Sequence, residues 1–179
     1  MAALQEASAG QEGRCCGVRY ECNERLLDRR SSGVQSLNPG KVVAAGLAAG
    51  VAYALVHEAD LRLTGNKADD FVILGRPFVK QPEHARPVGA VFHAFNAIAL
   101  AALYARVQSR LPGPPWLRGV LFANLENVLL YPITVFEDRH PAVQDGQVDR
   151  YLTWPSFWQS VPRHTAYGAV LGVLVDRWG

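Results

Sequence analysis

The sequence predicts an all-α fold, an integral membrane bundle of four transmembrane helices in a single domain. Four apolar stretches lie at about residues 42–60, 88–107, 119–136 and 161–177 of the 179-residue chain. Each is close to the length of about 20 residues that crosses a bilayer, and each carries at least one polar residue. The stretch at 88–107 leaves no polar face, whereas a helix of a soluble bundle needs one. These observations together favour a membrane bundle over a soluble one.

The chain separates into a polar N-terminal region and a more apolar remainder. Residues 1–41 hold few large apolar side chains, so we expect a disordered tail there, and residues 42–179 form the four-helix transmembrane domain. Cys15, Cys16 and Cys22 all lie in this tail, with the spacing of neither a disulfide framework nor a zinc site. The formal net charge of +2 argues against a nucleic-acid partner.

The first two helices are bounded by turn-forming residues. We expect the first helix at 42–63, where Asn38 and the following Pro-Gly are suited to its N-terminal cap. The second helix is expected to begin after Pro87 and to end near Val107, before the Pro- and Gly-rich break at 111–115.

The last two helices contain a proline near one end. We expect the third helix at 117–136, with Pro132 in its last turns, and the fourth at 161–177. Pro162 would then occupy the first turn of the fourth helix, where a proline is tolerated. The aromatic stretch 151–158 before it is expected to lie flat on the membrane surface.

The distribution of basic residues indicates how the protein is oriented in the membrane. The loop between the second and third helices carries Arg106, Arg110 and Arg118 and no acidic residue, which favours a cytoplasmic N-terminus. The basic residues are 15 Arg and 3 Lys, a bias typical of a GC-rich bacterial genome. The expected location is therefore the bacterial plasma (inner) membrane, with multiple passes. The lipid bilayer is the expected partner, together with a second copy of the chain or a larger membrane complex.

Stripes of small residues predict where the helices touch. Gly46 and Gly50 share one helical face with Tyr53 and His57, and the fourth helix repeats small residues at Gly168 and Gly172 on the face of His164. Small residues allow close approach of membrane helices, and polar residues form hydrogen bonds across them.

Four ionisable residues are the candidate site: His57, His93, Glu126 and His164. With alternating helix directions, the three histidines lie roughly 5–8 Å below the same interface, and Glu126 lies deeper. The set suits a divalent metal ion, because imidazole and carboxylate bind zinc, iron or manganese. It also suits a proton relay, and interhelical hydrogen bonding without any chemistry remains a third interpretation. No catalytic residue is assigned.

Other motifs are weaker. His57-Glu58-Ala59-Asp60 lacks the second histidine of a zinc-protease helix, and the cluster 137–141 is more typical of a solvated loop. Neither a phosphate-binding glycine loop nor a G-x-S-x-G motif is present.

The segment from His164 to Gly172, with its Tyr-Gly pair and a second glycine, resembles the closing helix of the YagU-like small bacterial inner-membrane proteins. His93, Tyr104 and the Arg118-Gly119 pair are similar in layout, whereas Glu126 departs from that pattern. The resemblance implies a four-helix inner-membrane protein without an established activity. We therefore expect a small polytopic membrane protein in ion or proton handling or an accessory subunit. The alternative is a membrane-embedded metal-dependent enzyme that uses the His/Glu cluster.

Overall fold

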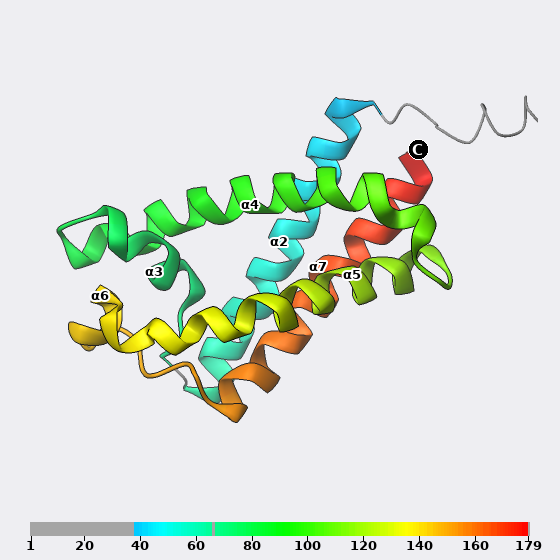
Figure 1. Ribbon diagram of the computed structural model, residues 1–179. Helices are drawn as coiled ribbons and strands as arrows, with labels where there is room; N and C mark the ends of the chain where they lie inside the picture. Colours follow the sequence, from blue (N-terminus) through cyan, green and yellow to red (C-terminus); the bar gives the residue numbers. More distant parts are fainter. Residues whose placement is uncertain (1–37, 66, 179) are drawn as a thin grey trace, which may run out of the picture. The chain divides into compact units, whose positions relative to one another are not determined.

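The computed structural model describes residues 38–65 and 67–178, and all regular structure within them is helical (Figure 1). The predicted all-α class is therefore confirmed. The α-helices are α2 (Pro39–Thr64), α3 (Asp70–Gly75), α4 (Ala85–Val107), α5 (Pro115–Leu130), α6 (Pro141–Gln144) and α7 (Trp154–Trp178). Short 3₁₀ segments are η1 (Arg76–Phe78), η2 (Pro82–His84), η3 (Gln108–Arg110) and η4 (Tyr131–Arg139). Of the tail expected at residues 1–41, residues 1–37 with the three cysteines lie outside the described residues, and Pro39, Gly40 and Lys41 belong to α2.

Helix boundaries follow local side-chain chemistry. Asn38 caps α2 by accepting a hydrogen bond from the Gly40 amide at 2.9 Å, and the helix begins at Pro39, three residues before the expected boundary. Gly65 ends α2 with φ of 66°, a conformation that glycine adopts without steric cost. Asp69 caps α3 through the amides of Phe71 and Val72.

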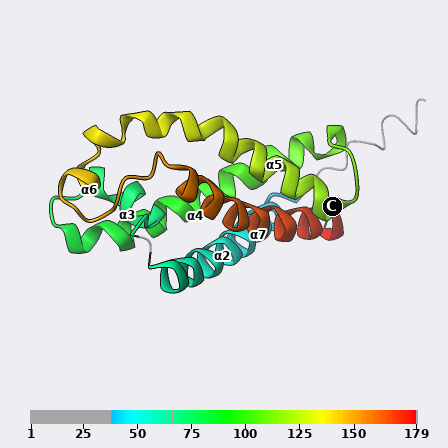
Figure 2. The ribbon, with the colours of Figure 1, turned by 90° about the horizontal axis from the view of Figure 1, so that it is seen from below.

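Successive long helices alternate in direction: α2 and α5 run toward the left of Figure 1, and α4 and α7 run toward its right, and Figure 2 shows the same alternation. Lys41 near the start of α2 donates to the carbonyl of Trp178 at the end of α7, which fixes these two antiparallel helices. Helix α7 packs against α5 and α2, while α4 packs against α2 and α3. Helices α4 and α5 approach each other chiefly near the turn that joins them, where the Tyr104 and Phe122 rings are 5.3 Å apart.

The predicted small-residue stripes lie at helix contacts. A methyl group added at Gly119 of α5 would lie 1.9 Å from the Gly168 carbonyl oxygen of α7. One added at Gly46 would lie 2.9 Å from the Ala97 carbonyl oxygen of α4. Such separations leave no room for a side chain, so glycine is what allows these backbones to meet.

Two helical segments within the described residues, Pro39–Thr64 and Pro82–Arg110, are long and apolar enough to cross a membrane. Helix α5 has 16 residues and a length of about 24 Å, less than the hydrocarbon core of about 30 Å. Helix α7 has 25 residues, but its first half contains Arg163 and other polar residues. The two candidate spans support a membrane protein only in part, because the core helices of soluble proteins pass the same test.

The start of α7 differs from the prediction. The helix begins at Trp154 instead of residue 161, so Pro162 lies inside it and not in its first turn. The aromatic residues Trp154 and Trp158, expected on a separate surface segment, belong to its first two turns. The predicted start was wrong because prolines are common in the first turn of a helix, whereas Pro162 is tolerated further inside α7.

Candidate functional site

A cavity of about 300 Å³ lies in the half of the bundle that carries α3, and all four long helices line it. Its polar lining includes Tyr53, Asp70, His93, Glu126, Arg163 and His164. Apolar residues, among them Leu100 of α4 and Leu130 of α5, complete the walls. The cavity therefore combines ionisable groups with a hydrophobic surface.

Tyr53 of α2 is at the centre of the three histidines that the sequence singled out. Its ring centroid is 4.6 Å from that of His93, 5.3 Å from His164 and 6.2 Å from His57. Its hydroxyl donates to Asp70 Oδ2 at 2.5 Å. Tyr53 thus connects residues of α2, α3, α4 and α7 in one polar cluster.

Arg163 of α7 is buried between two carboxylates. Its NH1 donates to Asp70 Oδ2 at 2.7 Å, and its NH2 donates to Asp60 Oδ2. A buried charge is tolerated when it is paired and hydrogen-bonded. The two aspartates provide this compensation, and Arg163 in turn connects α7 to α2 and α3.

His57 is fully buried beside the turn that leads into α3. Its Nε2 is 3.2 Å from Asp69 Oδ1, and Asp69 Oδ2 is 2.9 Å from Arg86 Nε. Burial of Asp69 opposes its ionisation, but the hydrogen bond from His57 and the charge of Arg86 together hold its pKa below the usual value. Asp69 is therefore a carboxylate at neutral pH.

Glu126 and His164 form a pair across α5 and α7, with Oε2 and Nε2 3.4 Å apart. His164 Nδ1 is 2.8 Å from the Ser160 carbonyl oxygen, which can only accept, so this nitrogen carries a proton. The other ring nitrogen, Nε2, is the one that faces the Glu126 carboxyl group. Glu126 and His164 thus bring a carboxyl group and an imidazole into contact in the lining of the cavity.

The family model of a family of unknown function (DUF6789) matches residues 38–179. The chain belongs to the DUF6789 family. The matched range begins at Asn38, the residue that caps α2, and extends over all the helices named above. The resemblance to the YagU-like proteins is not confirmed. No match was found among curated proteins or among solved structures.

In this DUF6789 member, the four predicted metal ligands are divided among three environments. Glu126 pairs with His164, His57 pairs with Asp69, and His93 packs between the rings of Tyr53 and Phe71. Within residues 38–65 and 67–178, no group of three or more His, Cys, Asp or Glu side chains is arranged to hold a metal ion. A divalent metal centre at these four residues stays a prediction.

The two asparagines beside Glu126 have structural partners. Asn124 donates to Thr165 Oγ1 at 3.2 Å, and Asn127 donates to Ser160 Oγ at 2.7 Å. Both bonds join α5 to α7. Interhelical hydrogen bonding therefore explains why these two polar residues lie within an apolar helix.

The sequence pattern did not identify three residues that line the cavity: Tyr53, Asp70 and Arg163. The sequence pattern predicts a packing position for Tyr53, and nothing in it singles out Asp70. Arg163 directly precedes His164 in an expected span, and a charge in that position is itself a signal of a polar interior.

The cluster at 137–141 also differs from its interpretation as a solvated loop. Glu137 is buried, and its Oε2 accepts from the amides of Tyr151 and Leu152 at 2.6 and 2.7 Å. It ties η4 to the segment that leads into α7. Glu137 is thus a structural residue beside the cavity.

Proposed function

We propose that this protein is a small multi-pass membrane protein whose cavity takes up and releases protons from one side of the bilayer. The observation that carries the proposal is the Glu126–His164 pair, in which a carboxylate oxygen and an imidazole nitrogen lie 3.4 Å apart in the lining of the cavity. The alternatives from the sequence, an accessory subunit and a general ion-handling protein, fit the same geometry.

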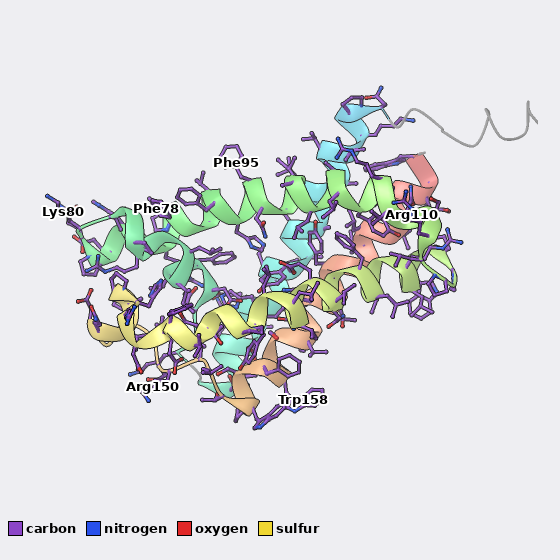
Figure 3. The ribbon with its side chains drawn as sticks, in the orientation of Figure 1. Phe78, Lys80, Phe95, Arg110, Arg150 and Trp158 are labelled. Carbon is purple, nitrogen blue, oxygen red and sulfur yellow. The ribbon has the colours of Figure 1, made fainter. Side chains whose placement is uncertain are left out.

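The distribution of side chains supports a membrane location. On α2 the exposed residues include Val43, Leu47, Val51 and Leu55, spaced by four, whereas His57 of the same helix is fully buried. Helices α4 and α5 likewise expose large apolar side chains, and Phe95 of α4 points outward in Figure 3. Exposed apolar stripes around a polar interior are unfavourable in water and favourable in a bilayer.

Four spans are part of the proposal. Helix α5 continues into η4, and together they extend from Pro115 to Arg139. This length is enough to cross a bilayer, and α7 is long enough as well. With a cytoplasmic N-terminus in a bacterial inner membrane, the cavity half of the bundle lies toward the outer side.

A series of ionisable groups leads from the cavity to the polar end of the bundle. Tyr53, Asp70, Glu126 and His164 line the cavity, whose volume accommodates several water molecules of about 30 Å³ each. Beyond it, Asp70 Oδ2 is 3.7 Å from His57 Nδ1, which has no hydrogen-bond partner among the described residues, and His57 Nε2 is 3.2 Å from Asp69 Oδ1. This series provides a route for protons between the pair and the polar surface.

The half of the bundle farther from α3 is packed with apolar side chains, and this favours proton exchange with one side of the membrane only. Its core consists of apolar and small residues, including Ala101, Tyr104, Phe122, Leu171 and Val175. A packed apolar core offers no hydrogen-bonded path for a proton. The geometry therefore suits a proton-binding subunit better than an open channel.

Infrared difference spectroscopy of the protein in lipid tests the proposal. Acidification should produce the band of a protonated carboxyl group, and Glu126→Gln should remove it. Glu83→Gln, a change in the exposed η2 segment, is the matched control and should leave the band unchanged. A spectrum without any contribution from Glu126 would refute proton binding at the pair. Proteoliposomes should show no steady proton flux, because the apolar half is closed.

A metal-dependent enzyme is the second candidate, and one observation favours it. Within the described residues, His93 Nε2 is buried without a hydrogen-bond partner, and His93 lines the same cavity as Glu126 and His164. The test is the metal content of the detergent-purified protein beside His93→Ala and Glu126→Ala. About one divalent ion per chain, lost in both variants, would support this candidate.

A further inference from the structure

We infer that the cavity binds a neutral amphiphile, with a ring head that bears carbonyl or hydroxyl oxygens, which enters from the lipid between α4 and α5. The inference rests on the membrane location proposed above and not on proton exchange. No redox or transfer step is implied.

The cavity opens between these two helices. Helices α4 and α5 contact each other mainly at the Tyr104–Phe122 end, and the lining residues Leu74, Asn96 and Leu130 are exposed. They come from α3, α4 and α5, so the mouth lies where α4 and α5 diverge on either side of α3 (Figure 1). In a bilayer this mouth faces lipid, and Leu74 and Leu130 flank it as surfaces for an apolar tail.

The charged side chains of the cavity already pair with one another, which favours a neutral ligand. Arg163 is compensated by Asp60 and Asp70, and Glu126 is paired with His164. An ionic head would disturb one of these pairs and would also lose its own hydration.

Two polar groups that lack a hydrogen-bond partner in the described part of the chain indicate which chemical groups the ligand's head must carry. His93 Nε2 is buried without a partner, and the Asn96 amide at the mouth has no hydrogen-bond partner among the described residues. Unsatisfied polar groups in an apolar surrounding cost free energy, and a ligand with carbonyl or hydroxyl oxygens removes that cost. Both residues lie on α4, one turn apart, so a single head can reach both.

The shape and lining favour a flat ring. Tyr53, Tyr131, Tyr151 and Tyr167 line the cavity together with two histidines. Aromatic walls favour stacked or edge contacts with another ring. The volume of about 300 Å³ suits a substituted monocyclic head, while the tail stays outside between the helices.

Calorimetric titration of the purified full chain in detergent tests this with decylubiquinone, a substituted benzoquinone with an alkyl tail, as the probe. We expect saturable binding at one site per chain. Asn96→Leu should weaken binding by about tenfold, the loss of roughly one hydrogen bond. Asn96 is exposed and has no partner to lose, so this variant should fold normally, which its thermal unfolding checks.

Phe95→Leu is the matched control, because Phe95 lies on α4 beside Asn96 but outside the cavity lining. This variant should bind decylubiquinone with the affinity of the wild type. Decanol, which has the tail and a hydroxyl but no ring, should bind much more weakly. Absence of saturable binding, equal affinity in Asn96→Leu, or equal affinity for decanol would overturn the inference. Saturable binding without the Glu126 infrared band would refute proton exchange and leave the inference intact.

Discussion

Arg163, in the first half of α7, donates to Asp70 at the first position of α3 over 2.7 Å, although 93 residues separate them in the chain. The same guanidinium also holds Asp60 of α2. This contact ties three helices together at the wall of the cavity. The short helix α3 is therefore held in place by a buried charge as well as by its packing on α4.

Removing the positive charge of Arg163 should destabilise the protein. Arg163→Met leaves Asp60 and Asp70 without compensation and should lower the free energy of unfolding by about 3–5 kcal/mol, measured by chemical unfolding in detergent. Arg150→Met is the control, because its pair with Asp138 is exposed and should contribute about 0–1 kcal/mol. Equal losses in the two variants would contradict the structural role of Arg163.

Alanine substitutions at two glycines should differ in their effect. At Gly119 the new methyl group would lie 1.9 Å from a backbone oxygen of α7, and the helices must separate, so we expect a loss of about 1–3 kcal/mol. At Gly50 the nearest atom is a side-chain carbon at 3.0 Å, and the gain in helix propensity of about 1 kcal/mol offsets the strain. Thermal unfolding in detergent measures both. A Gly119→Ala variant as stable as the wild type would show that α5 and α7 do not pack this closely.

Stability should depend on pH through Asp69, which lies between α2 and α3. Its native pKa is held below the unfolded value of about 3.9 by His57 and Arg86, despite its burial. A lowered pKa stabilises the fold fully above the unfolded value, and this contribution disappears as the pH falls through the native value. Asp69→Asn should therefore flatten the loss of stability in acid.

This substitution is specific to the charge, because an asparagine oxygen can still cap α3. Unfolding midpoints measured between neutral and acidic pH, for both proteins, provide the comparison. If the two profiles remain parallel, the ion pairs of Asp69 contribute nothing to the pH dependence.

Glu137 should control the segment that precedes α7. Glu137→Gln replaces a buried carboxylate that accepts from two backbone amides, with an expected cost of about 1–3 kcal/mol. Hydrogen exchange should accelerate at the amides of Tyr151 and Leu152. Asp138→Asn, at an exposed position, should leave both rates unchanged. Unaltered exchange in Glu137→Gln would mean that other contacts hold this segment.

Local signals in the sequence predicted much of the fold. The long helices were evident because apolar runs end at strong breaks, such as the Pro- and Gly-rich turn at 111–115. The contacts at Gly46 and Gly168 could be predicted because only small residues allow backbones to approach so closely. These signals depend on residues a few positions apart.

The centre of the site could not be predicted in the same way. Arg163 and Asp70 meet only after the whole chain has folded, and their charges by themselves resemble those of a loop. Helix α3 has six residues, too few for a periodic pattern to stand out. The burial of Glu137 likewise depends on amides more than ten residues away.

The central claim is that the apolar faces lie in lipid and enclose a polar interior, and electron paramagnetic resonance tests it most directly. Nitroxide labels at Leu47 of α2 and Leu125 of α5, in a chain whose three cysteines are replaced by serine, report collisions with oxygen and with a water-soluble nickel chelate. In lipid vesicles, both positions should be accessible to oxygen and protected from nickel, whereas a label at exposed Asp138 should show the reverse. Leu125 is the decisive position, because α5 alone is too short to span. Free access of nickel to Leu125 would contradict the account.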